Sequence, residues 1–206
     1  MLEIREASFD ENQIIREVAD LHVLTFQGFF LTFMGKGFLR QLYGSFCKHP
    51  DSGLLIAAED GKTVGFLAYS GNYSQLFKYM IRSKLIPFAW YSLGAFFRKP
   101  KVFMRLIRAF LKPGETKRTE NYMELSSIGV DPERKGQGVG SKLIDTLKQK
   151  ADFRNFRYIS LETDAENNEN AIRFYEKNGF VREREFVTNE GRKMLEYHYT
   201  DGLDKA

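Results

Sequence analysis

The sequence has a single cysteine, Cys47, among its 206 residues. An internal disulfide is therefore excluded, and with it the class of small folds that disulfides hold together. Cys47 falls within a predicted helix, where we expect it to pack as a small apolar residue. The three histidines are far apart in the sequence. Without a close spacing of His, Cys or acidic residues, no metal site is expected.

Long apolar runs are also missing. No uninterrupted apolar run reaches the roughly 18 residues that a membrane span needs. The longest apolar block, residues 85–97, is interrupted by Pro87 and flanked by basic residues. Residues 1–5 lack the basic-then-apolar pattern of a secretory signal. Together with the lone cysteine, these features lead us to expect a cytoplasmic protein.

Acidic residues are nearly absent from residues 72–118, which hold eleven Lys or Arg and one Glu, a net charge of +10. The whole chain has a net charge of +4, so the rest of it carries −6. The same segment holds ten aromatic residues. Its spacing predicts helices over Gln75–Ile86, Phe88–Phe97 and Val102–Leu111, with breaks at Pro87, Pro100 and Pro113. A basic, aromatic insertion is thus set into an otherwise acidic domain.

Elsewhere the apolar spacing changes between the periods of strands and helices. The pair Asp60-Gly61 between two apolar runs is a strong hairpin signal. The resulting order is β-α-α-β-β-insertion-β-α-β-α-β-β, which predicts an α/β (α+β) fold with a mixed central sheet in one domain over residues 1–206. Strands are predicted at Leu2–Ala7, Leu54–Glu59, Thr63–Ser70, Tyr122–Val130, Arg157–Thr163, Phe180–Val187 and Arg192–Tyr199, and helices at 10–26, 37–48, 141–151 and 168–178.

Residues 128–143 combine a strand, a turn with proline, alternate glycines and a helix, in the order Ile-Gly-Val-Asp-Pro-Glu-Arg-Lys-Gly-Gln-Gly-Val-Gly-Ser-Lys-Leu. Glycines let the backbone approach a ligand, and amides beside a helix N-terminus suit a pyrophosphate. The dinucleotide-binding fingerprint is excluded because it needs G-x-G-x-x-G after an early strand. The P-loop is excluded because Lys142 follows Ser141, the wrong order.

This stretch resembles the pyrophosphate loop of the GNAT family, the GCN5-related N-acetyltransferases. That loop has Gln or Arg, two spacers, Gly, one spacer, then Gly or Ala, and the matching positions are Lys135, Gly138 and Gly140. Lys135 departs from the usual Gln or Arg, but lysine also holds phosphate, as a point charge. A second match, Asn168–Phe180 (Asn-Glu-Asn-Ala-Ile-Arg-Phe-Tyr-Glu-Lys-Asn-Gly-Phe), resembles the family's cofactor-side helix. The closest resemblance covers residues 120–182.

The resemblance implies a GNAT acyltransferase fold, with a mostly antiparallel sheet flanked by helices and the helical insertion 72–118 between strands 3 and 4. It also implies an N-acetyltransferase that uses acetyl-CoA and no metal. The strand Met123–Val130 would run beside acetyl-CoA, its amides polarising the thioester carbonyl. The implied cofactor-binding residues are Ile128, Val130, Arg134, Lys135, Gly136, Gln137, Gly138, Val139, Gly140, Ser141 and Asn168. For Asn168 a helix cap is the alternative.

Two residues match the catalytic positions of the family. Tyr175 matches the tyrosine that protonates the departing thiolate, with aromatic packing beside Phe174 as the alternative. Glu124 falls where histone-acetylating members carry their catalytic base; the alternatives are a ligand of the substrate amine and a solvated strand residue. By alternation, Glu124 is expected to share a face with Ser126 and Ile128. Weaker candidates are Ser127, Glu162 and Thr163 as base and His22 as a substrate contact.

The acceptor and the role of the insertion stay open. A basic, aromatic segment fits a helical cap, a pocket for a small-molecule amine, a homodimer surface, or attachment to an anionic membrane. The amine could be an amino sugar or a sugar nucleotide, and the phosphates of a sugar nucleotide would suit the basic residues. A peptide or protein amine is the alternative acceptor, although its charge would favour an acidic groove that the insertion lacks. The alternative to an enzyme is a non-catalytic acyl-CoA-binding module with the same fold. No nucleic-acid-binding motif accompanies the charge, which argues against nucleic acid.

Overall fold

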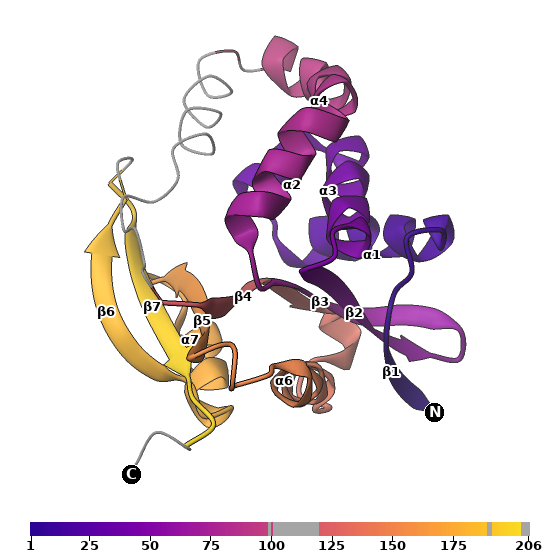
Figure 1. The fold of residues 1–206 in the computed structure, drawn as a ribbon. Helices are drawn as coiled ribbons and strands as arrows, with labels where there is room; N and C mark the ends of the chain where they lie inside the picture. The colour runs from indigo at the N-terminus through magenta and orange to yellow at the C-terminus, as the bar shows by residue number, and fades with distance from the viewer. Residues whose placement is uncertain (99, 101–119, 189–190, 203–206) are drawn as a thin grey trace.

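The computed structural model describes residues 1–98, 100, 120–188 and 191–202. A seven-stranded sheet with the order β1-β2-β3-β4-β5-β7-β6 runs through its centre (Figure 1). The β4–β5 pair is parallel and the other neighbouring pairs are antiparallel, as a mixed, mostly antiparallel sheet requires. The strands are β1 (Leu2–Glu6), β2 (Ser52–Glu59), β3 (Lys62–Ser70), β4 (Tyr122–Val130), β5 (Tyr158–Asp164), β6 (Val181–Val187) and β7 (Lys193–Tyr199).

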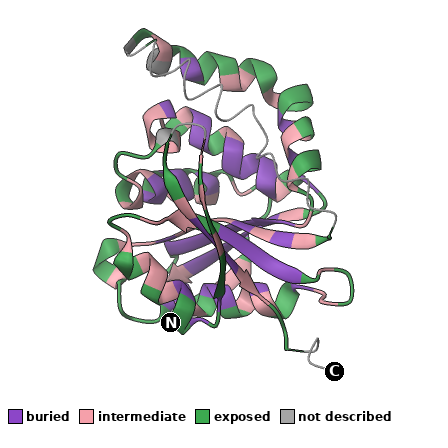
Figure 2. Ribbon diagram, turned by 90° about the vertical axis from the view of Figure 1, so that its left-hand side faces the viewer, coloured by how far each residue is buried: buried purple, intermediate pink, exposed green. Residues whose placement is uncertain are grey.

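Helices cover both faces of this sheet, and burial is greatest where they meet it (Figure 2). On one face lie α1, α3 and the first half of α4, and on the other lie α6 and α7. The helices are α1 (Asn12–Thr25), α2 (Phe30–Met34), α3 (Lys36–Lys48), α4 (Tyr73–Arg98), α6 (Val139–Lys150) and α7 (Glu169–Lys177), with a 3-10 turn η1 (Pro132–Arg134). The predicted fold class is confirmed, and so is the predicted order of elements, except that the short helix α2 was not predicted.

Strand β2 shows how the sequence builds two cores at once. Leu55 and Ala57 join the core under α6, whereas Leu54 and Ile56 join the core under α1 and α3. Successive strand residues point to opposite faces, and helices cover both faces here. The strand therefore reads as a continuous apolar run rather than as alternating apolar and polar residues.

The hairpin between β2 and β3 turns at Asp60 and Gly61, as predicted. Both residues have positive φ, 50° and 80°. Two consecutive left-handed residues define a type I′ turn, whose twist matches that of the flanking strands. A Cβ on Gly61 would meet nothing within 4 Å, so only the backbone conformation favours glycine there.

The predicted break at Pro87 is wrong, because α4 continues through it from Tyr73 to Arg98. Figure 2 shows that this helix changes direction sharply along its length. A proline inside a helix removes one backbone hydrogen bond and bends the axis without always ending the helix. Packing holds the helix on both sides of Pro87, since Leu76 and Met80 before it are buried and Phe88 after it contacts Phe38 with ring centroids 4.7 Å apart. The predicted helix 102–111 lies outside the described residues.

Candidate active site

The two central parallel strands pair over a short distance only. Tyr122, Met123 and Glu124 of β4 pair with the first three residues of β5, and no later residue of β4 pairs with β5 in the described structure. Both strands continue, β4 to Val130 and β5 to Asp164. Beyond Glu124, the backbone groups on this side of β4 therefore have no ladder partner from β5. Such N–H and C=O groups need hydrogen bonds from another source, which a bound ligand can supply.

A β-bulge lies in β4 at the same place. Ala68 of β3 pairs with Ser127 and Tyr69 pairs with Leu125, so Ser126 is the extra residue. The bulge reverses the alternation of side chains after it. The prediction that Glu124 shares a face with Ile128 is therefore wrong. Ile128 packs against the core on the α6 side, whereas Glu124 shares the opposite face with Ser127.

The glycine turn after β4 is built to leave amides exposed. Asp131 accepts a hydrogen bond from the Glu133 backbone N–H at 3.0 Å and starts η1. Gly136 and Gly138 have φ near 80° and a Cβ on either would meet nothing, so the backbone angle selects glycine. Gly138 is the N-cap of α6, whose first amides have no intrahelical partner. Together with the helix dipole, these amides form an anion site suited to a pyrophosphate.

Not every predicted residue of this loop offers its side chain to a ligand. Val139 is 4% exposed and belongs to the core, which leaves its backbone amide for a phosphate. A Cβ on Gly140 would lie 2.9 Å from the Phe174 ring, so this glycine lets α6 approach α7. Arg134 forms a 2.8 Å ion pair with Glu59 of β2. Gln137 donates to the Glu133 carbonyl at 3.2 Å. Of the side chains, Lys135 is exposed and Ser141 half-buried.

Asn168 is the N-cap residue of α7, but its side chain does not cap the helix. Its amide nitrogen donates instead to the Thr163 hydroxyl at 2.6 Å and to the Asp164 carbonyl at 3.0 Å. The side-chain cap considered as an alternative is therefore wrong. The amide ties the end of β5 to the start of α7, and contact with a cofactor stays a prediction.

Tyr175 lies on α7 at the sheet face that α6 also covers. It is 9% exposed and packs with Phe180 and Tyr197, with ring centroids 6.1 and 6.4 Å away. Burial raises the pKa of its phenol to about 12. The hydroxyl therefore stays protonated over the whole physiological range and acts as a hydrogen-bond donor.

Glu124 lies on the other face of the sheet, close to Glu162 and Tyr73. Glu124 pairs in register with Ser160, and Glu162 follows two residues later, so both carboxylates share this face. Tyr73, at the start of α4, lies close enough to both carboxylates to interact with their charges. Burial first, and then these two negative charges, raise the pKa of its phenol. An acidic surface with an aromatic edge thus lies where β4 and β5 separate.

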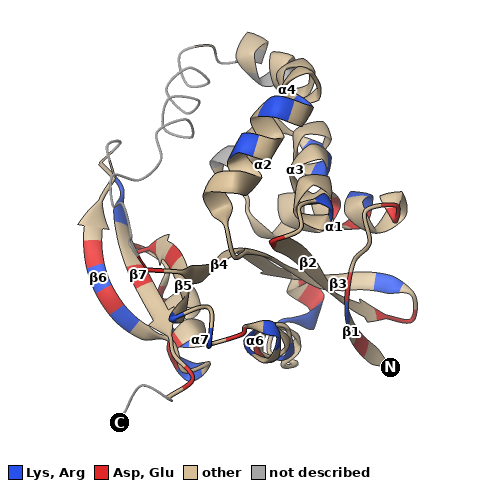
Figure 3. Ribbon diagram, viewed as in Figure 1, with Lys and Arg blue, Asp and Glu red and all other residues tan. Residues whose placement is uncertain are grey.

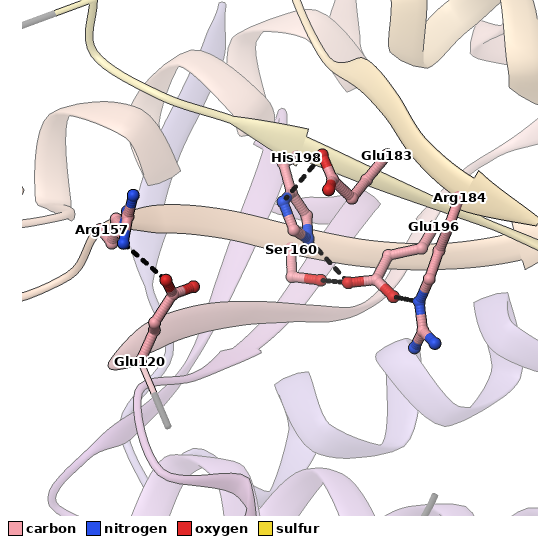
Figure 4. A network of polar contacts seen from close by, with 7 residues as sticks. All are labelled: Glu120, Arg157, Ser160, Glu183, Arg184, Glu196 and His198. Carbon is pink, nitrogen blue, oxygen red and sulfur yellow. Dashed lines mark hydrogen bonds and ion pairs between the residues drawn. The ribbon is translucent and has the colours of Figure 1, made fainter. Parts of the chain in front are cut away.

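The same face continues into a polar network on β5, β6 and β7 (Figure 4). Glu196, which is 2% exposed, lies directly opposite Glu162 on the neighbouring strand. Arg184 donates to one carboxylate oxygen of Glu196 at 2.6 Å, and the His198 ring contacts the other at 2.6 Å. These partners offset the cost of burying a carboxylate beside another acid. The contacts of Glu196 hold β6 and β7 together beside the acidic surface.

A chain of three polar side chains, His22 and Tyr43 buried and Ser127 half-buried, reaches the bulge from the helices. His22 of α1 lies 2.6 Å from the Tyr43 hydroxyl, which lies 3.4 Å from the Ser127 hydroxyl. Burial lowers the pKa of His22 to about 4, so it is neutral at neutral pH. Among the described side chains, His22 Nε2 and Ser126 Oγ are buried polar atoms without a hydrogen-bond partner. Sequence reasoning considered His22 and Ser127 separately and did not find Tyr43.

Comparison with known proteins assigns the chain to a family. The model of the acetyltransferase (GNAT) family matches residues 16–180, about four fifths of the chain. No curated protein matches.

Solved structures share the fold at low identity. An acetyltransferase assigned to the GNAT family from Desulfovibrio desulfuricans is similar with a TM-score of 0.60 and 17% identity, covering 97% of this chain and 99% of that one. An N-acetyltransferase from Staphylococcus aureus Mu50 has a TM-score of 0.59 and 16% identity over 97% and 98% of the two chains. The ribosomal-protein-S18-alanine N-acetyltransferase from Escherichia coli has a TM-score of 0.57 and 14% identity over 97% and 94%. At such identities the likeness shows the fold alone.

Proposed function

This chain belongs to the GNAT family of acetyltransferases, and we propose that it transfers an acetyl group from acetyl-CoA to the primary amine of a small molecule. The observation that carries the proposal is the separation of β4 from β5 directly beyond Glu124, next to the glycine turn. This separation leaves backbone amides that can bind the acetyl donor. They lie close to acidic residues that can bind the acceptor amine. Acetyl-CoA is the co-substrate that the family uses.

The donor would be held mainly by backbone atoms. We assign the pyrophosphate to the amides of Gly138–Ser141 at the start of α6, with Lys135 as the nearby cation. The pantetheine arm would follow the unpaired side of β4, with Ile128 and Val130 below it on the α6 face. A β4 amide beside the bulge would polarise the thioester carbonyl, because a fixed donor stabilises a developing oxyanion.

The two catalytic candidates lie on opposite faces of the sheet. We assign Glu124 as the general base that takes a proton from the attacking amine, directly or through water. The amine nitrogen forms a bond to the carbonyl carbon, and collapse of the tetrahedral intermediate breaks the carbon–sulfur bond. The departing thiolate then gains a proton.

The raised pKa of Tyr175 favours one of two roles for its hydroxyl, hydrogen-bond donation rather than full proton transfer. A phenol with a pKa of about 12 is a weaker acid than a thiol of pKa near 8.5, so full transfer of its proton to the thiolate is uphill. We therefore assign Tyr175 as the group that donates a hydrogen bond to the sulfur as its charge develops. A proton from solvent can then complete the reaction.

The acceptor we propose is an amino sugar or a sugar nucleotide that carries an amine, and of the two the sugar nucleotide suits better because its phosphates are anionic. Its amine suits the face of Glu124 and Glu162, and its phosphates suit the net charge of +10 on residues 72–118. A peptide amine is the second candidate. The acidic surface that it needs is absent from the insertion but is present on β4 and β5.

Steady-state acetyl transfer, measured with amino-sugar nucleotides, free amino sugars and short peptides, tests the function. We expect saturable turnover with the first class, and E124Q and Y175F to lower kcat about a hundredfold. Tyr197→Phe is the control for Tyr175, because Tyr197 is a buried neighbour in the same core and its hydroxyl donates to Glu176 at 3.0 Å. Turnover of peptides alone would overturn the acceptor assignment. Full activity of both catalytic variants would overturn the mechanism.

A further inference from the structure

The second half of α4 exposes large apolar side chains on one side. Ile86, Trp90, Leu93 and Phe97 are 81%, 70%, 43% and 76% exposed. Their spacing of four, three and four residues places neighbours on the same side of a helix. Soluble monomers rarely expose an apolar patch of this kind without a binding role. We call these four residues the α4 stripe.

The charge around the α4 stripe is of one sign. The helix carries Lys78, Arg82 and Lys84 before the stripe and Arg98 after it, and no Asp or Glu. Figure 3 shows the basic bands on α4 without an acidic one. Lys78 and Arg82 are exposed, and Arg82 precedes Ile86 by one helical turn. An occupant must therefore cover apolar side chains and also carry negative charge.

We infer that the α4 stripe docks on a bilayer surface that contains anionic lipids. Phosphate headgroups match the basic residues, and the acyl boundary accepts Ile86, Leu93 and Phe97. Tryptophan is favoured at the membrane interface, where its ring is buried and its N–H is still solvated, which suits Trp90. A second copy of this chain fits less well, because pairing two α4 helices would bring basic residues against basic residues.

The contact is peripheral and leaves the donor side open. No helix in the described ranges is long and apolar enough to cross a membrane, so α4 would lie along the surface. In Figure 1 the second half of this helix lies beyond α2 and α3, on the side of the sheet away from α6 and α7. The glycine turn at the start of α6 would therefore face away from the bilayer. Docking and acetyl-CoA binding are expected to be compatible.

Trp90 provides a direct test, because it is the single tryptophan of the chain. The purified full-length protein is mixed with phosphatidylcholine vesicles that contain or lack phosphatidylglycerol. We expect a blue shift of Trp90 emission and co-sedimentation with the anionic vesicles only, both weakened by added salt. Replacing Arg82 with Ser is expected to lower the partition coefficient about fivefold.

Two double variants show whether vesicle binding depends on the α4 stripe or on exposed apolar residues in general. The double variant I86E/F97E is expected to lose the vesicle binding. The matched control V181E/V187E changes two valines on β6 that are 70% and 61% exposed, and it should bind like the wild type. Circular dichroism and acetyl-CoA titration check that all variants are folded. Absence of a blue shift with anionic vesicles, equal loss in the control, or a lipid-free blue shift that accompanies dimerisation would overturn the inference.

Discussion

His22 Nδ1 and the Tyr43 hydroxyl lie 2.6 Å apart inside the core that α1 and α3 form on the sheet. The two residues come from different helices, and both are almost fully buried. Tyr43 extends the contact to Ser127, beside the bulge of β4. Helix packing is thus connected by hydrogen bonds to the strand on which the chemistry is proposed.

This contact predicts a loss of stability in mild acid. Burial lowers the pKa of His22 from 6.5 to about 4. Between these pH values the unfolded chain binds a proton that the folded chain does not, so the free energy of unfolding falls as pH is lowered. The contribution of His22 is full above pH 6.5 and decreases by about 3 kcal/mol on the way to pH 4.

Urea unfolding of the wild type and of His22→Gln at several pH values between 7 and 4 checks this prediction. Carboxylates also respond to acid, but the difference between the two proteins removes their common effect. The variant should show the shallower dependence on pH. Identical slopes in the two proteins would mean that His22 binds its proton equally well in both states.

Two glycines with the same backbone angle allow a test of the anion site. Gly61 in the β2–β3 hairpin and Gly138 before α6 both have φ +80°, and a Cβ on either meets nothing within 4 Å. Replacement by Ala should therefore destabilise the fold similarly, by about 1–2 kcal/mol. Only G138A is expected to weaken acetyl-CoA binding, by at least about tenfold, because strain at this φ would displace amides that hold a charged ligand and the added Cβ would hinder its approach to the backbone. Calorimetric titration of G61A and G138A with acetyl-CoA measures the two affinities. Equal affinities would contradict the placement of the pyrophosphate at the start of α6.

The buried carboxylate in Figure 4 predicts unequal effects for two neighbouring arginines. Arg184 pairs with Glu196, whose side chain is 2% exposed, whereas Arg182 pairs with Glu185, whose side chain is 46% exposed. R184M leaves a buried charge short of its cationic partner and should cost about 3 kcal/mol. R182M should cost less than about 1 kcal/mol. Denaturant midpoints measure both losses, and equally small losses would show that the other contacts of Glu196 compensate for the missing arginine.

The glycine turn and the order of elements were predictable because local sequence determines them. Positive φ at Gly136 and Gly138 and the hairpin at Asp60-Gly61 follow from residue type. The bulge at Ser126 was not predictable, since it depends on the register between β3 and β4 rather than on either strand alone. Alternation therefore placed Ile128 on the wrong face.

Tertiary packing explains the other differences from the sequence predictions. Pro87 does not end α4, because packing holds the helix on both sides of the bend: Leu76 and Met80 before it are buried, and Phe88 after it contacts Phe38 of α3. The contact between His22 and Tyr43 joins α1 and α3. The residues that connect these two helices have no regular apolar period from which the contact could be inferred. Neither residue type nor period carries that information.

The pKa of Tyr175 leads to a prediction for the alkaline side of the pH profile. Because burial raises it to about 12, the phenol should remain protonated at pH 10, where an exposed tyrosine is half ionised. We expect kcat to show no decrease with an apparent pKa near 10, while Y175F lowers kcat at every pH. Ultraviolet titration at 295 nm of the wild type and Y175F identifies the phenol directly. A decrease in kcat near pH 10 that disappears in Y175F would mean that bound acetyl-CoA opens this part of the core to solvent, and Tyr175 could then act as a full proton donor.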